Sequence, residues 1–266
     1  MSPNATVTLH TGSKMPILGL GTWQLTHDTA GTVKAAFDLG YRMIDTSGDY
    51  GTQPGIGQAI KHSGVPRDLV YITTKVEETD DAYEATRKNL EELQLDYADL
   101  MLIHRPPDQG AGQDLWQGLM RAKNEGLARD IGVSNYSVEL IEALIDATGH
   151  VPAVNQIEWS PFGRSETMLR YCQERSIAIQ AYSPLTRTKR LGDRVLQAIA
   201  ARYDKTPAQL LIRWNLQLGT VPLPKANRRR HLEENIAVFD FEIASDDMES
   251  LNALNERYSS LGTLPY

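Results

Sequence analysis

Short apolar runs alternate with longer amphipathic stretches along the whole chain. The runs are rich in Ile, Leu and Val, as expected of strands that are covered on both faces. These predicted strands are residues 17–21, 42–46, 70–76, 98–104, 130–134, 153–158, 177–183 and 220–224. The stretches between them have the apolar spacing of helices. The predicted helices are residues 29–39, 53–62, 80–93, 113–124, 138–148, 166–175 and 207–218, with another that begins near His231.

Eight strand–helix units in succession predict a parallel sheet, and eight parallel strands close into a (β/α)8 TIM barrel. Residues 6–9 and 14–15 read as a β-hairpin before the first strand, and 193–203 and 246–256 as two extra helices. The expectation is therefore one α/β barrel domain over residues 1–266. The alternative is an open doubly wound sheet, which usually carries a G-x-G-x-x-G turn after its first strand. Here Gly19-Leu-Gly21 is followed by Thr-Trp-Gln, which weakens that alternative.

The composition narrows the function classes. The 27 Lys and Arg against 34 Asp and Glu give a net charge of −7, the wrong sign for binding nucleic acid or an anionic membrane. Cys172 is the single cysteine, so no intramolecular disulfide can form. No signal-peptide pattern and no long apolar stretch is evident. We expect a cytoplasmic protein without a metal, a nucleic-acid partner or a membrane partner.

Four polar residues lie at or just after three consecutive predicted strands. They are Asp45, Tyr50, Lys75 and His104. Each has an ordinary structural explanation. Asp45 could cap a turn, Tyr50 could pack as an aromatic, Lys75 could form a surface ion pair, and His104 could be a hydrogen-bonded histidine at a strand end. Because the active site of a barrel lies where the strands end, the four side chains are expected to converge on one pocket.

That combination suits carbonyl reduction. Tyrosine is a poor proton donor near neutrality, and an ammonium nearby lowers its pKa. A carboxylate can hold the lysine, and a histidine can orient a carbonyl oxygen. Since no side chain donates hydride, a nicotinamide or flavin is required.

The residues resemble the aldo-keto reductase superfamily over essentially the whole chain. The similar segments are GSKMPILGLGTW (12–23), GYRMIDTSGDYG (40–51), DLMLIHRP (99–106), IGVSN (131–135), NQ (155–156) and AYSPL (181–185). The resemblance implies that Tyr50 is the general acid, that Asp45 and Lys75 tune it, and that His104 orients the carbonyl.

The resemblance also implies a nicotinamide site. Ser134, Asn135 and Gln156 would bind the carboxamide, and Tyr182 would stack on the ring. Ser183 and Leu185 would meet the pyrophosphate. The residues bordering the nicotinamide, beside Asp45, would be Gly21, Thr22 and Trp23, with Trp23, Tyr50, His104 and Arg105 facing substrate.

The last motif departs from the family pattern. It reads PKANRRRHLEEN at residues 224–235, so Ala226 replaces a serine and His231 replaces the usual arginine for the 2′-phosphate. The remaining cofactor candidates are Lys225, Asn227, Arg228, Glu234 and Asn235. The basic run beside a helix start still favours phosphate, so NADPH is expected, with NADH as the second candidate.

Arg105 stands where the family often has an aromatic residue. The short loop at 106–112 and the short tail at 258–266 are similar to those of microbial reductases of the diketogluconate and xylose type. The expected activity is NADPH-dependent reduction of aldehydes and ketones by a monomer, with polar or small carbonyl substrates favoured. One alternative is a catalytically silent nucleotide-binding regulatory or interaction protein on the same barrel. Another is a phosphate-handling barrel lyase or isomerase, which leaves the four strand-end residues without a role.

Overall fold

A parallel sheet forms the centre of the molecule. The computed structural model describes residues 1–25 and 27–266. In order around the sheet, the eight strands are β3 (Leu20–Gly21), β4 (Met43–Asp45), β5 (Tyr71–Val76), β6 (Ala98–Ile103), β7 (Ala128–Ser134), β8 (Val154–Glu158), β9 (Ala178–Tyr182) and β10 (Val221–Pro222). All neighbouring pairs are parallel.

Backbone hydrogen bonds between the first and last strands close this sheet into a barrel. The amide of Gly19 donates to the carbonyl of Pro222 at 3.1 Å, and that of Gly21 donates to Pro224 at 3.2 Å. A Cβ on Gly21 would lie 2.8 Å from the carbonyl oxygen of Leu223, so this close approach requires glycine. The predicted (β/α)8 barrel is confirmed, and the open doubly wound sheet is wrong.

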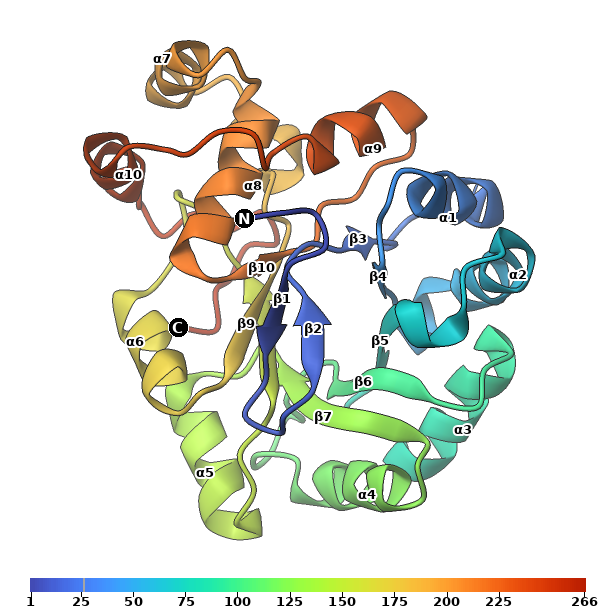
Figure 1. Cartoon of the computed structure of the whole chain (residues 1–266). Coiled ribbons are helices and arrows are strands. Elements are labelled where there is room, and N and C mark those ends of the chain that lie inside the picture. Colours follow the sequence, from blue (N-terminus) through green and yellow to red (C-terminus); the bar gives the residue numbers. More distant parts are fainter. Residues whose placement is uncertain (26) are drawn as a thin grey trace.

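Helices surround the barrel, as Figure 1 shows. The helices that follow strands are α1 (Thr29–Asp38), α2 (Gln53–Ser63), α3 (Ala82–Leu93), α4 (Gln113–Asn124), α5 (Val138–Thr148), α6 (Glu166–Glu174), α8 (Pro207–Leu218) and α9 (Arg229–Ile236). The two extra helices are α7 (Arg194–Arg202) and α10 (Ser245–Asn252). Most helix limits agree with the sequence pattern to within two residues, and caps mark many of them; Thr206 and Gln209, for example, form a capping box at the start of α8. The exception is α10, which ends at Asn252, four residues before the predicted end.

The predicted hairpin covers the N-terminal end of the barrel. Strands β1 (Thr6–Thr8) and β2 (Lys14–Pro16) are antiparallel and lie across this end in Figure 1. Met15 is fully buried, and its sulfur accepts a hydrogen bond from Gln180 at 3.2 Å. Since this end is closed, a ligand must enter from the opposite end, where the strands have their carboxyl termini.

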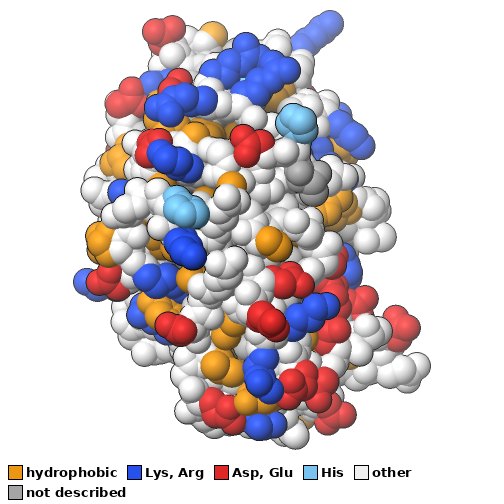
Figure 2. Space-filling view, turned by 90° about the vertical axis from the view of Figure 1, so that its right-hand side faces the viewer, with side chains coloured by type: hydrophobic (Ala, Val, Ile, Leu, Met, Phe, Trp, Pro, Cys, Tyr) orange, Lys and Arg blue, Asp and Glu red, His pale blue; other side chains and the backbone are white. Residues whose placement is uncertain are grey.

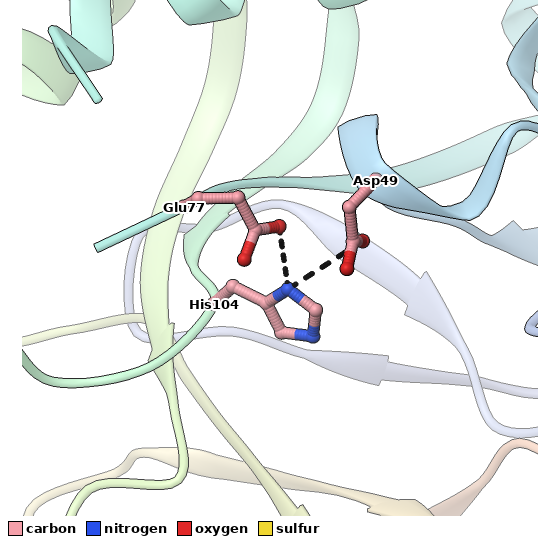
Figure 3. Close-up of side chains that lie close together, drawn as sticks. All are labelled: Asp49, Glu77 and His104. Atoms are coloured by element: carbon pink, nitrogen blue, oxygen red, sulfur yellow. Dashed lines mark hydrogen bonds and ion pairs between the residues drawn. The ribbon is translucent and has the colours of Figure 1, made fainter. Parts of the chain in front are cut away.

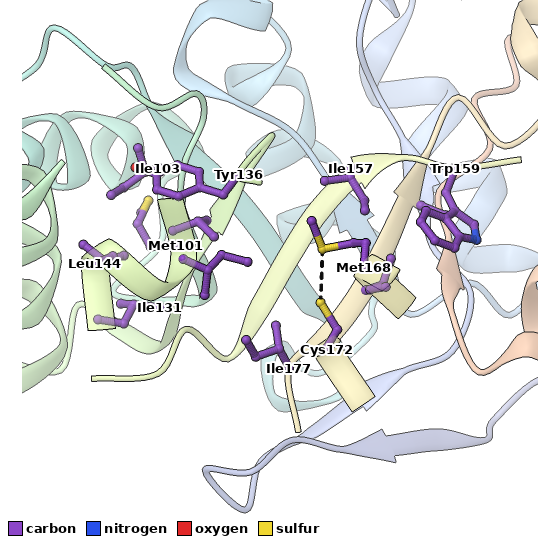
Figure 4. Close-up of a cluster of buried hydrophobic side chains, with 14 of the residues drawn as sticks. Met101, Ile103, Ile131, Tyr136, Leu144, Ile157, Trp159, Met168, Cys172 and Ile177 are labelled. Atoms are coloured by element: carbon purple, nitrogen blue, oxygen red, sulfur yellow. Dashed lines mark hydrogen bonds between the residues drawn. The ribbon is translucent and has the colours of Figure 1, made fainter. Parts of the chain in front are cut away.

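The main core lies between the barrel wall and the helices. Figure 4 shows one part, in which Met101 and Ile131 from the strands pack near Leu144 of α5, and Met168 contacts Cys172 within α6. Figure 2 shows the side that carries α1 and α2, where acidic and basic side chains are mixed and hydrophobic ones form small separate patches. Within residues 1–25 and 27–266, no helix is long and apolar enough to cross a membrane.

Candidate active site

A cavity of about 760 Å³ opens at the C-terminal end of the barrel. Most of the residues singled out in the sequence line it. From the predicted set these are Gly21, Trp23, Asp45, Tyr50, His104, Arg105, Ser134, Asn135, Gln156, Tyr182, Ser183, Leu185, Lys225, Asn227, Arg228 and His231. The barrel therefore brings residues from the whole length of the chain to one site.

A buried ion pair forms the base of the cavity. Lys75 Nζ lies 2.9 and 3.0 Å from the two carboxylate oxygens of Asp45 and donates to the carbonyl of Thr46 at 2.6 Å. The side chains of Lys75 and Asp45 are 0% and 6% exposed. Burial lowers the pKa of Lys75, but Asp45 and Tyr50 outweigh it and leave that pKa raised. The lysine is therefore a fixed ammonium behind the cavity.

Tyr50 stands above this pair, at the end of a short 3₁₀ turn, η1 (Gly48–Tyr50). Lys75 Nζ lies 4.9 Å from the centre of the Tyr50 ring. Burial raises the pKa of Tyr50, the Lys75 ammonium lowers it, and Asp45 and Asp49 raise it again. The net direction is upward, so the lysine offsets only part of the effect of burial, whereas the sequence predicted a lowered pKa.

His104 follows β6 and faces Tyr50, with the ring centres 5.7 Å apart. Its Nδ1 lies 2.7 Å from Oε1 of Glu77 and 3.8 Å from Oδ1 of Asp49 (Figure 3). Ser47 donates to the same Glu77 oxygen at 3.0 Å, and Arg105 lies 3.3 Å from the other. Burial raises the pKa of Glu77, but the contacts with His104, Ser47 and Arg105 outweigh it and hold that pKa below its usual value.

Asp49, Glu77 and His104 place one potential metal-ligand atom each within 4.8 Å of one another. His104 and Arg105 already engage both oxygens of Glu77, so these contacts need no ion to explain them. The expected absence of a metal stays a prediction.

One wall is a hydrogen-bonded network of the predicted carboxamide-binding residues. Tyr182 donates to the side-chain oxygen of Asn135 at 2.8 Å, and the Asn135 amide donates to Ser134 at 3.1 Å. The Gln156 amide donates to Asp45 at 2.7 Å and to Gln180 at 2.8 Å. Both donor hydrogens of Gln156 are thus engaged, and its oxygen remains as an acceptor.

Cations gather at the outer end of the cavity, beside the start of α9. Lys225, Arg228 and Arg187 all line it. Among the described residues, none of the three has a carboxylate oxygen within 4.0 Å. Burial, followed by the charge of Arg187, lowers the pKa of Lys225. Cations brought together without acidic partners fit the phosphates of a dinucleotide.

Four predicted site residues lie outside the cavity lining. Lys75 is behind Tyr50, and Thr22 donates to the carbonyl of Asp45 at 2.8 Å. Glu234 accepts a hydrogen bond from Thr206 at 2.5 Å, and Asn235 is buried. Thr22 and Lys75 thus contact Asp45 at the base of the cavity, whereas Glu234 and Asn235 lie on α9 outside the lining.

Residues 17–256 match the family model described as the aldo/keto reductase family. The chain belongs to the aldo/keto reductase family. It is accordingly an oxidoreductase that uses a nicotinamide cofactor, as the sequence resemblance implied.

Similar proteins cover nearly the whole chain. An aldo-keto reductase of Mycobacterium tuberculosis is 42% identical over 94% of this chain and 91% of its own length. A glyoxal reductase of Bacillus subtilis is 41% identical over 94% and 93%. Among solved structures, the Bombyx mori aldo-keto reductase in complex with NADP has a TM-score of 0.92 and 31% identity, covering 98% of this chain and 95% of its own.

Two charged residues of this aldo-keto reductase site were missed in the sequence. Glu77 belongs to a pair of glutamates just after β5, a pattern typical of a solvated loop. Arg187 lies in a turn after β9, where it stacks on Trp23 at 4.2 Å. A charged residue shortly after a barrel strand was the available signal for both, since those loops surround the active site.

Proposed function

We propose that the protein catalyses the NADPH-dependent reduction of aldehydes and ketones to alcohols, with Tyr50 as general acid. The observation that carries the proposal is the position of Tyr50 in the cavity, between the buried Asp45–Lys75 pair and the His104 ring. A phenol, an ion pair and an imidazole lie close together here, and this arrangement supports the proposal.

A nicotinamide cofactor bound in the cavity would supply the hydride that the carbonyl carbon receives. Tyr50 then gives its phenolic proton to the carbonyl oxygen, so that one C–H bond and one O–H bond replace the C=O π bond. Lys75 stabilises the phenolate left on Tyr50 because its ammonium is fixed by Asp45. His104, whose ring faces Tyr50, would orient the same oxygen.

The basic outer end of the cavity supports NADPH as the preferred cofactor. Lys225 and Arg228 would meet the 2′-phosphate and Arg187 the pyrophosphate, which are contacts between cations and anionic oxygens. The relative from Bombyx mori was solved with NADP. Ala226 and His231 replace a serine and an arginine of the family pattern in this segment. We therefore propose a moderate preference for NADPH over NADH, with NADH as a second cofactor.

We propose polar or small carbonyl compounds as substrates. Arg105 at the rim is half-exposed and can reach an anionic or hydroxylated group, while Trp23 and Leu261 supply limited apolar surface. The relative named glyoxal reductase supports a small substrate. We also propose that residues 1–266 act as one domain, as a monomer, in the cytoplasm.

The test is the oxidation of NADPH and NADH, followed at 340 nm, with glyoxal, a carboxylated aldehyde and an uncharged aromatic aldehyde. We expect turnover with at least the two polar compounds and a higher kcat/KM with NADPH. Nucleotide binding without turnover of any carbonyl compound would instead favour the silent regulatory protein.

A further inference from the structure

The environment of His104 Nδ1 determines which nitrogen of the ring carries a proton. The Glu77 carboxylate lies 2.7 Å from Nδ1 and is ionised, with its pKa below the usual value after burial is outweighed by its partners. An ionised carboxylate can only accept hydrogen bonds. Nδ1 must therefore carry a hydrogen and donate it to Glu77.

The second nitrogen, Nε2, points away from both carboxylates in Figure 3, and the His104 ring lines the cavity. In neutral histidine with a proton on Nδ1, Nε2 presents a lone pair. A substrate carbonyl oxygen also presents lone pairs, so the two would repel. Nε2 can donate to that oxygen only when the ring is an imidazolium.

We propose that Glu77 is a positioning residue that holds His104 with Nδ1 protonated, so that His104 assists carbonyl reduction as an imidazolium paired with Glu77. The inference rests on the proposed function, because it concerns the second donor to the same carbonyl oxygen. This role differs from that of a neutral histidine that donates from Nε2, because such a ring carries no hydrogen on Nδ1.

Both carboxylate oxygens of Glu77 have a contact with a residue other than His104. Ser47 donates to Oε1 at 3.0 Å, and Arg105 lies 3.3 Å from Oε2. These contacts fix the carboxylate toward Nδ1, since rotation away would break them. Glu77 is 22% exposed and His104 is 7% exposed, so water screens the pair less than it screens a surface pair.

The other charged or titratable groups around the ring come from three segments. Asp49 of η1 lies 3.8 Å from Nδ1 and also favours a positive ring. Tyr50 of the same turn faces the ring, with Lys75 of β5 beyond it. Arg105 opposes a positive ring, but it lies against Glu77 and 3.7 Å from Glu78. Two carboxylates, those of Glu77 and Asp49, therefore lie within 4.0 Å of Nδ1.

The test compares wild type with Glu77→Gln, using Glu78→Gln as the matched control. A glutamine amide can donate to Nδ1, which allows the neutral ring to carry its proton on Nε2. Below the pH range in which Tyr50 ionises, we expect the pH profile of kcat/KM for reduction to change in Glu77→Gln and to stay as in wild type in Glu78→Gln.

Nitrogen-15 NMR of the His104 ring, in EDTA and without substrate, gives the second readout. The signal is assigned by its loss in His104→Asn. We expect a protonated Nδ1 in wild type at every pH and a protonated Nε2 in neutral Glu77→Gln. A bare Nδ1 in the wild type would overturn the inference, and so would pH profiles that coincide in wild type and Glu77→Gln. Because the NMR needs no turnover, it decides this point even where the proposed reductase activity fails.

Discussion

The two ends of the cavity differ in how their charges are balanced. At the inner end, Lys75 and Asp45 are buried and pair with each other through two close contacts. At the outer end, Lys225, Arg187 and Arg228 are exposed and have no carboxylate within 4.0 Å in the described part of the chain. The inner end is complete without a ligand, whereas the outer end has charge left over.

This difference in charge pairing predicts different consequences for substitutions at the two ends of the cavity. A buried pair is costly to break, because the remaining charge has lost its hydration. Removing an exposed cation changes the stability of the fold little, but it removes the attraction of that cation for a phosphate. We therefore expect substitutions at the inner end to affect folding and chemistry, and substitutions at the outer end to affect cofactor affinity.

Lys75→Met is expected to have the largest effect. It leaves the Asp45 carboxylate buried without its cation, which typically costs about 3–5 kcal/mol of stability. It also removes the charge that stabilises the Tyr50 phenolate. Urea denaturation and kcat measure the two losses. The double variant Asp45→Asn with Lys75→Met should regain stability but not activity; a stable, active Lys75→Met would show that the pair has neither role.

His231→Arg should have a smaller effect, confined to the outer end. His231 lines the cavity beside Arg230, with 3.3 Å between Arg230 Nε and His231 Nε2. A guanidinium binds phosphate through two hydrogen bonds, so we expect NADPH to bind about fivefold to tenfold more tightly, or roughly 1–1.4 kcal/mol. Fluorescence titration measures both cofactors. Equal tightening for NADH would mean that this position does not meet the 2′-phosphate.

Arg105→Trp should have the smallest effect, at the rim. The guanidinium is 50% exposed and already pairs with Glu77 and Glu78, so only part of its charge is available to a substrate. We expect about a fivefold selective loss of kcat/KM for a carboxylated aldehyde, or roughly 1 kcal/mol, with an uncharged aromatic aldehyde as control. A parallel change for both aldehydes would exclude charge selection by Arg105.

The fold was predictable from the sequence because strand and helix periods alternate regularly. The first and last strands are shorter than their apolar runs, since only Leu20–Gly21 and Val221–Pro222 pair as regular strands where the barrel closes. The predicted helix at 246–256 is α10, which begins one residue earlier at Ser245 and ends at Asn252. Such shifts depend on local backbone geometry that the residue types do not determine.

The site was predictable where residues follow strand ends directly, as Asp45 and His104 do. The place of Glu77 after β5 puts it near the site, but its contact could not be predicted, because the contact depends on the side-chain direction of His104, which comes from another strand. Arg187 could not be assigned either. Its turn runs through left-handed backbone at Thr186, Arg187 and Thr188, a path that the residue types do not suggest.

The separation of chemistry from cofactor affinity is tested most directly by measuring kcat and the NADPH dissociation constant for Tyr50→Phe and Lys225→Ala together. Arg229→Ala is the control, because Arg229 lies on the same basic segment but pairs with Glu233 outside the cavity. We predict that Tyr50→Phe lowers kcat by about 10²–10⁴ with an unchanged dissociation constant. Lys225→Ala should weaken NADPH binding with kcat largely retained. Loss of NADPH binding in Tyr50→Phe, or near-normal kcat in that variant, would contradict the account.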